Sequence, residues 1–177
     1  SPLTVIVGAA QGIGAEVART LARSGPVTLA DIQLDAAAEL AAELTASGAE
    51  ATAHSVDVTS PESVAALVAA TPGTRRLAIV ADAFSASPSL ELESAEFTRI
   101  LSVNLVGAYD VARQYSAAMI EFGGGAIVAI GSIAARMPRL RQAAYSASKA
   151  GMRQAMRVLG LEVREPGVRI NFVAPGP

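Results

Sequence analysis

The stretch LTVIVGAAQGIG, residues 3–14, carries the pattern that decides the fold. Residues 3–8 form a continuous apolar run that ends in glycine, which is typical of a strand buried on both faces. Apolar residues then recur at helical spacing from Ile13 to Leu21, and the helical pattern closes at Gly25. The stretch therefore predicts a strand, a glycine-rich turn and a helix in direct succession.

The same alternation of strand and helix continues along the whole sequence. We predict strands at residues 3–8, 26–31, 51–58, 76–83, 123–132 and 167–175, and helices at 12–25, 33–48, 60–71, 94–122 and 143–163. Strands that alternate with helices through short turns require right-handed crossovers, which produce a mostly parallel sheet with helices on both faces. We therefore expect an α/β protein with a doubly wound, Rossmann-like sheet in three layers, forming one domain over residues 1–177.

The composition excludes several classes of protein. A net charge of -2 argues against a nucleic-acid partner, and no uncharged run reaches the roughly 18 residues that a membrane helix needs. The absence of cysteine excludes a disulfide and a thiolate metal site, and we predict no metal site of any kind. The first residues run straight into a strand, so we see no signal peptide. We expect a soluble cytoplasmic protein.

The first turn has the features of a phosphate-binding loop. It contains Gly8, Gln11, Gly12, Ile13 and Gly14, so backbone N–H groups at the start of a helix are open to an anion. The spacing is G-x-x-x-G-x-G, and a glycine-rich turn also occurs where nothing binds. The strand and helix on either side favour a dinucleotide-binding site.

Acidic residues follow the second and third predicted strands. Asp31 lies at the offset of about twenty residues at which a carboxylate meets the adenosine ribose hydroxyls. A carboxylate there repels a 2′-phosphate, so NAD is favoured over NADP, although an ordinary turn aspartate is the alternative. Asp57 either accepts a hydrogen bond from adenine or caps the helix that follows it.

The only lysine of the chain lies one helical turn after a tyrosine, in a sequence with thirteen arginines. Tyr145 and Lys149 are at positions i and i+4 of a predicted helix, so both side chains can share one site. A phenol with a pKa of about 10 is a poor base, and a nearby ammonium lowers that pKa. A chance surface lysine is the alternative. Ser132, after the fifth strand, could bind a substrate oxygen, and Asn104 is unusual inside a helix.

Taken together, GAAQGIG, Asp31, DVT, Asn104, GSIAA, YSASK and NFVAPGP resemble the NAD-binding short-chain dehydrogenase/reductase family over the whole chain. The resemblance implies that Tyr145 is the catalytic acid/base, that Lys149 lowers its pKa and holds the nicotinamide ribose, and that Ser132 orients the substrate oxygen. Asn104 would organise a water-linked proton path. Further contacts with the dinucleotide are implied for Val58, Ala81, Ala83, Pro175 and Gly176.

The sequence departs from the family at three places. Val7 stands where the family usually has threonine, and the family's NNAG motif is replaced by ADAF at residues 81–84. Asp82 and Phe84 would then alter how the adenine ribose sits. Family members normally continue through a substrate-covering loop, a further helix and a seventh strand, so we expect the C-terminal part to be missing.

Three arginines lie close together in the loop after Ser132. Arg139 and Arg141 suggest a small anionic substrate, because guanidinium binds carboxylate through two hydrogen bonds, although a solvated charged loop is equally compatible. The surrounding stretch is similar to that of 2,3-dihydro-2,3-dihydroxybenzoate dehydrogenases. The alternatives are an NADPH-dependent 3-oxoacyl-carrier-protein reductase and a non-catalytic dinucleotide-sensing protein. The family resemblance also implies a homotetramer or homodimer.

Overall fold

A single parallel sheet of six strands organises the protein. The computed structural model describes residues 1–176, and the strand order is β3-β2-β1-β4-β5-β6. All neighbouring strands are parallel. The strands are β1 (Thr4–Val7), β2 (Val27–Asp31), β3 (Ala51–Ser55), β4 (Arg76–Ile79), β5 (Gly125–Ile130) and β6 (Val168–Val173). The order reverses between β1 and β4, so the crevice at this switch point is where a ligand is expected.

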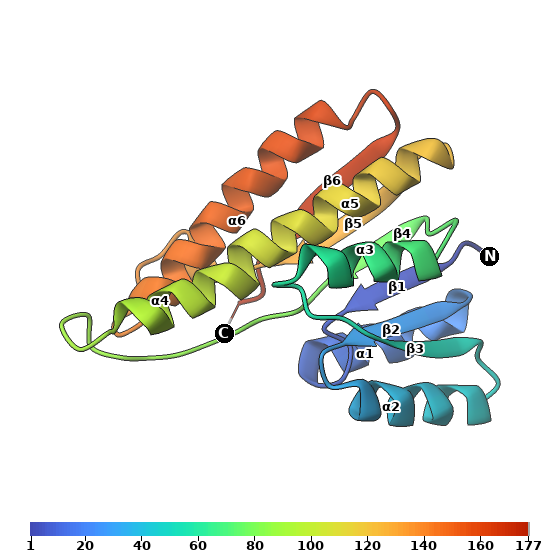
Figure 1. The fold of residues 1–177 in the computed structure, drawn as a ribbon, viewed down its shortest axis with the longest axis horizontal. Coiled ribbons are helices and arrows are strands. Elements are labelled where there is room, and N and C mark those ends of the chain that lie inside the picture. Colours follow the sequence, from blue (N-terminus) through green and yellow to red (C-terminus); the bar gives the residue numbers. More distant parts are fainter. Residues whose placement is uncertain (177) are drawn as a thin grey trace.

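Helices cover both faces of the sheet and make three layers (Figure 1). Helices α1 (Gly12–Leu21) and α2 (Leu34–Ala46) pack on β1, β2 and β3 from one side. On the other side lie α3 (Pro61–Ala70), α5 (Ala108–Glu121) and α6 (Ala143–Glu162), while α4 (Ser94–Leu101) precedes α5. The doubly wound α/β fold that the sequence predicts is confirmed.

The first strand explains why a continuous apolar run is needed. Val5 and Val7 point into the core shared with α3, α5 and α6, whereas Ile6 points into the core under α1 and α2. All three side chains are fully buried. Successive strand residues point to opposite faces, so a strand covered on both sides needs apolar residues at every position.

The long helix predicted at residues 94–122 is not continuous. Between α4 and α5 the chain forms a π-helical segment, Ser102–Gly107, with Asn104 fully buried within it. A π-helical turn inserts an extra residue into the helix and commonly marks a functional site. Sequence periodicity does not reveal such an insertion, because the helix continues on both sides of it.

Five of the six predicted strands end earlier than the sequence suggested, the third and the fourth by the most. The third ends at Ser55 and the fourth at Ile79, so Asp57 and residues 81–83 lie in the loops beyond them. These loops are at the carboxyl edge of the sheet, where the backbone after β1 also closely approaches the backbone after β4.

That close approach depends on the glycine at the end of β1. Gly8 has a φ of +88°, and a Cβ placed on it would lie 2.3 Å from the backbone nitrogen of Ala81. A Cβ on Gly14 would lie 1.9 Å from the carbonyl oxygen of Gly8. The turn, the start of α1 and the loop after β4 therefore pack backbone against backbone.

We expect Gly8→Ala to destabilise the protein more than Gly48→Ala, by about 1–3 kcal/mol of unfolding free energy, because only the first adds a clash to the conformational cost. Gly48 is a matched control, since its φ is +92° and an added Cβ meets nothing within 4 Å. Urea denaturation of both variants measures the difference. Equal losses would contradict the proposed close approach.

Candidate active site

A cavity of about 600 Å³ opens at the carboxyl edge of the sheet, beside the switch point between β1 and β4. Its lining comes from the ends of the strands, the first turn of α1, α4, α6 and the chain after β6. The predicted site residues that line it are Gly8, Gln11, Ile13, Asp31, Asp57, Val58, Ala81, Ala83, Ser132, Tyr145, Lys149, Pro175 and Gly176. Most of the residues that the sequence singles out are therefore brought together at one place.

One end of the cavity has the chemistry that a dinucleotide requires. The N-cap residue of α1, Gln11, makes no side-chain capping hydrogen bond, so the first N–H groups of the helix remain available to a phosphate. Gly12 and Gly14 lie in this first helical turn rather than on the cavity wall. The arrangement fits the pyrophosphate of a nicotinamide dinucleotide.

Asp31 has two roles in the geometry of this end. Its Oδ2 accepts a hydrogen bond from the Ala10 N–H and its Oδ1 accepts one from the Gln33 N–H, both at 2.9 Å. The side chain thereby fixes the glycine-rich turn to the end of β2. It also lines the cavity, and its contact with a ribose stays a prediction.

Asp57 holds its own loop together. Its Oδ1 accepts hydrogen bonds from the backbone N–H and the hydroxyl of Thr59, and these bonds lower the pKa of Asp57. Ser60, not Asp57, caps α3 by accepting a hydrogen bond from the Ser63 N–H. Asp57 therefore remains a cavity residue and does not cap the helix.

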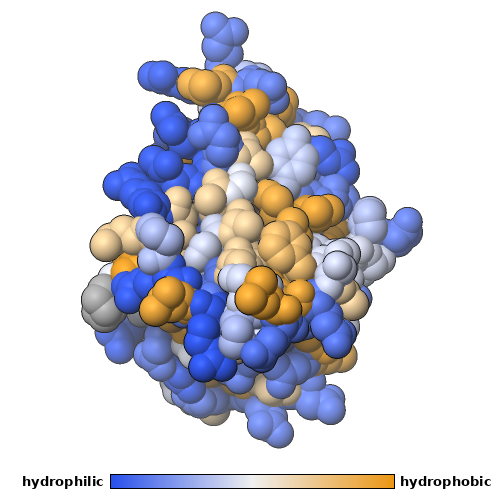
Figure 2. All heavy atoms as spheres, turned by 90° about the vertical axis from the view of Figure 1, so that its left-hand side faces the viewer, coloured by the Kyte–Doolittle hydropathy of each residue, from blue (hydrophilic) through white to orange (hydrophobic). Residues whose placement is uncertain are grey.

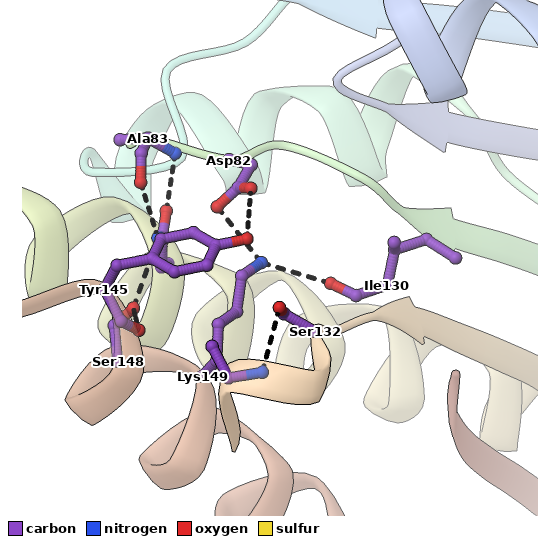
Figure 3. A network of polar contacts seen from close by, with 9 residues as sticks. Asp82, Ala83, Ile130, Ser132, Tyr145, Ser148 and Lys149 are labelled. Atoms are coloured by element: carbon purple, nitrogen blue, oxygen red, sulfur yellow. Dashed lines mark hydrogen bonds and ion pairs between the residues drawn. The ribbon is translucent and has the colours of Figure 1, made fainter. Parts of the chain in front are cut away.

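The other end of the cavity contains the tyrosine and lysine of α6 (Figure 3). The Lys149 ammonium lies 5.5 Å from the ring centroid of Tyr145, and Lys149 is 1% exposed. It donates a hydrogen bond to the carbonyl oxygen of Ile130 at 3.2 Å and forms an ion pair with Asp82 Oδ1 at 3.0 Å. The Tyr145 hydroxyl donates to Asp82 Oδ2 at 3.1 Å. Tyr145 and Lys149 thus share one site, and Asp82 joins them.

The pKa of Tyr145 does not move in the direction that the sequence predicts. Burial, the negative charge of Asp82 and its hydrogen bond raise the pKa to about 12, and a hydrogen bond from Ser132 acts in the opposite direction. Because Asp82 is paired with Lys149, the ammonium does not act on the phenol as an unopposed positive charge. The net effect of these surroundings is therefore a raised pKa of Tyr145, and the lowering by Lys149 that the family resemblance implies stays a prediction.

Asn104 holds the loop after β4 in place through hydrogen bonds of its side-chain amide. Its Oδ1 accepts from the Ala83 N–H at 2.7 Å, and its Nδ2 donates to the Ala83 carbonyl oxygen at 2.8 Å and to Ser148 Oγ at 3.2 Å. The side-chain amide is thus occupied by the protein itself, and Asn104 does not line the cavity. Its role in a proton path stays a prediction.

Asp82 and Phe84 both contact Tyr145, whereas the sequence had suggested an effect of these residues on the adenine ribose. Phe84 packs edge-on against the ring of Tyr145, with centroids 5.1 Å apart and an interplanar angle of 77°. It is 56% exposed and forms an apolar surface next to the phenol. The departure from the NNAG motif was the available signal, but only the structure shows where these side chains point.

Arg139 and Arg141 are exposed and are not among the residues that line the cavity. Their role in substrate binding stays a prediction. The Arg141 carbonyl oxygen accepts a hydrogen bond from the Ser87 N–H, which joins the loop after β5 to the loop after β4. Arg99 of α4 lines the cavity instead, next to its salt-bridge partner Glu96 at 2.7 Å. Arg99 could not be singled out from the sequence, since no motif surrounds it.

Comparison with known proteins shows which family the chain is similar to. Residues 2–177 match the family model described as short chain dehydrogenase. The chain is 34% identical to a 2,3-dihydro-2,3-dihydroxybenzoate dehydrogenase of Bacillus subtilis (strain 168), over 98% of this chain and 69% of the relative. It is also 34% identical to a cis-4-hydroxycyclohexanecarboxylate dehydrogenase of Sinomonas cyclohexanicum, over 98% of this chain and 72% of the relative.

A solved structure of a variant actinorhodin polyketide ketoreductase with NADPH has a TM-score of 0.94 and 33% identity, covering 99% of this chain and 70% of that chain. The chain belongs to the short-chain dehydrogenase/reductase family. Within that family it is a short-chain alcohol dehydrogenase or ketoreductase that uses a nicotinamide dinucleotide.

We expect Tyr145→Phe to lower kcat by about 100-fold or more, because it removes the transferable proton, while dinucleotide binding is retained. Steady-state kinetics and a dinucleotide titration measure the two effects. Tyr109→Phe makes the same chemical change outside the cavity and serves as the control. Unchanged turnover in Tyr145→Phe would favour the non-catalytic dinucleotide-sensing alternative.

Proposed function

We propose that the protein is an NAD(H)-dependent dehydrogenase that interconverts a secondary alcohol and a ketone on a ring bearing a carboxylate. The arrangement of Ser132, Tyr145 and Lys149 at one end of the cavity carries this proposal. A carboxylated cyclohexadiene diol is the proposed substrate class.

The proposed roles follow from the positions of these groups. Tyr145 transfers the proton to or from the substrate oxygen, and Ser132 binds the same oxygen from the end of β5. Lys149 reaches the same end of the cavity and is placed to bind ribose hydroxyls. The nicotinamide, when bound, supplies or accepts the hydride. Pro175 and Gly176 line this cavity after β6 and would contact the nicotinamide.

The preference for NAD over NADP is supported by the groups at the end of β2. A 2′-phosphate would meet the carboxylate of Asp31, and the two cavity residues that follow, Ile32 and Gln33, carry no charge. Two like charges placed next to each other weaken binding by several kcal/mol when no opposite charge compensates them. The NADPH in the similar ketoreductase structure belongs to that protein.

Two observations support a ring substrate with a carboxylate. The names of two similar proteins describe action on a dihydroxylated dihydrobenzoate and on a hydroxycyclohexanecarboxylate. Phe84 offers an exposed aromatic surface beside the Tyr145 ring, which suits a flat or cyclic molecule. Arg99 in the cavity wall and the exposed Arg139 and Arg141 are candidate cations for the carboxylate.

A panel of ring hydroxy acids, dihydrodiols, the same rings without a carboxylate and oxoacyl thioesters tests this proposal. Each compound is followed by the absorbance of reduced nicotinamide with NAD(H) and with NADP(H). We expect kcat/KM to be at least about tenfold higher for the carboxylated rings and for NAD(H), which corresponds to about 1.4 kcal/mol. Preference for oxoacyl thioesters with NADPH would establish the carrier-protein reductase alternative instead.

Variants of Arg139 and Arg141 test whether these residues bind the carboxylate of the substrate. Arg139→Ala and Arg141→Ala should raise KM for the carboxylated ring and leave KM for the uncharged ring unchanged. Unchanged kinetics in both would remove these two residues from the proposal and leave Arg99 as the cation to test.

We also propose that the protein forms a homotetramer or homodimer through the helices that contain Asn104 and Tyr145. Exposed apolar side chains on these segments, Val106, Val158 and Leu161, support this contact. The mass in solution measures it. No helix among residues 1–176 is long and apolar enough to span a membrane. The cytoplasmic location stays a prediction.

A further inference from the structure

Asp82 is a charged residue in the catalytic centre at a position where the family motif has a neutral asparagine. Each oxygen of its carboxylate has one partner in the catalytic pair: Oδ1 lies 3.0 Å from the Lys149 ammonium, and Oδ2 accepts the Tyr145 hydroxyl at 3.1 Å (Figure 3). The Asp82 side chain is 36% exposed, whereas that of Lys149 is 2% exposed. The carboxylate therefore connects a buried ammonium to the cavity.

We propose that Asp82 is a positioning residue that keeps Tyr145 in its acid form across the neutral pH range, so that the site protonates a ketone at neutral pH and deprotonates an alcohol efficiently only in alkaline solution. This inference rests on the proposed function, because it assigns a consequence to the acid/base role of Tyr145. It deepens that function by stating how the two directions of the reaction depend on pH.

The carboxylate of Asp82 has two electrostatic effects on Tyr145. A carboxylate that accepts the hydrogen bond of a phenol stabilises the neutral phenol, since ionisation would place two negative charges side by side. The same carboxylate neutralises the Lys149 ammonium, which would otherwise favour the phenolate. Both effects act in the same direction as the burial of Tyr145, and together they raise its pKa.

The other charges around the cavity do not oppose this effect by contact. Asp31 and Asp57 lie at the ends of β2 and β3 and are held by backbone N–H groups there. Arg99 of α4 pairs with Glu96. Among the charged cavity-lining residues of the described chain, Asp82 is hydrogen-bonded to the Tyr145 hydroxyl and Lys149 lies over its ring. The remaining contact on the hydroxyl comes from Ser132, which is uncharged.

The two directions of the reaction use different forms of Tyr145. In reduction, the hydroxyl proton moves to the carbonyl oxygen as the carbonyl carbon accepts a hydride from the reduced dinucleotide, and solvent then reprotonates the phenolate. In oxidation, the alcohol proton moves to the phenolate as the carbon loses its hydride to the oxidised dinucleotide. At neutral pH the phenolate fraction of Tyr145 falls tenfold for each unit by which its pKa rises, so Asp82 slows oxidation. Nearly all of Tyr145 is then in the neutral phenol form that reduction requires.

The ionisation of Tyr145 without added dinucleotide or substrate is the direct test. The chain has three tyrosines and no tryptophan, so tyrosinate absorbance is clear of tryptophan absorbance. The difference between each protein and its own Tyr145→Phe partner isolates Tyr145. We expect the unmodified chain to show a midpoint at a pH of about 12. Asp82→Asn keeps the shape of the side chain and removes its charge, and it should lower the midpoint by about one unit or more.

Two variants distinguish a specific effect of Asp82 from a general change of charge. Asp82→Glu keeps the carboxylate and should restore a high midpoint. Asp35→Asn removes the same charge from the exposed first turn of α2 and should leave the midpoint unchanged. An unchanged midpoint in folded Asp82→Asn would overturn the proposal. So would a midpoint at or below the ordinary value of about 10 in the unmodified chain, a measurement that needs no folded Asp82 variant.

Turnover gives a second readout. In Asp82→Asn, the midpoint of the pH profile of kcat/KM for oxidation should fall by the same amount as the absorbance midpoint, and oxidation at pH 7 should rise about tenfold per unit of that fall. A protein without turnover on any compound of the panel would refute the proposed function. The absorbance titration would still decide the effect of Asp82, so the two failures can be told apart.

Discussion

The close contact between the end of β1 and the loop after β4 is the constraint on which the site depends. Both Val80 and Ala81 donate their N–H groups to the Val7 carbonyl oxygen, and Gly8 leaves no Cβ between the two backbones. From this point the chain runs along the cavity to Ala83, which Asn104 holds by two hydrogen bonds. Asp82 lies between these two fixed points, so its carboxylate is directed at α6. A glycine at the switch point thus helps to determine which side chain reaches Tyr145.

The sequence predicted the fold well because the fold depends on periodicity and on glycine positions. Buried strands need apolar residues at every position, and amphipathic helices repeat with their own period, so both leave a pattern along the chain. The same is true of the i and i+4 pair in α6. The π-helical segment was not predictable, because one extra residue within a helix changes the direction of side chains without changing composition. It is this segment that places Asn104 against Ala83.

The parts of the site that the sequence did not reveal depend on the direction of side chains in loops. Asp82 and Phe84 were recognised as departures from a motif, yet their effect was expected at the adenine ribose. A loop residue has no periodic pattern that fixes where it points, and neighbouring residues in such a loop can face opposite ends of a cavity. The same reason accounts for Arg139 and Arg141, whose side chains are exposed and do not line the cavity. On the side of the molecule that lies to the left in Figure 1, apolar side chains gather near the centre and hydrophilic ones surround them (Figure 2).

An aspartate in place of an asparagine changes chemistry without requiring a change of shape. The two side chains have nearly the same volume, so the backbone contacts at Gly8 and Asn104 do not depend on which is present at position 82. The difference is one negative charge and the loss of two donor hydrogens. Beside a buried ammonium that charge is compensated, since Lys149 pairs with it, and folding therefore tolerates it. The charge affects the ionisation of the Tyr145 phenol, because the cation that would stabilise the phenolate is already neutralised.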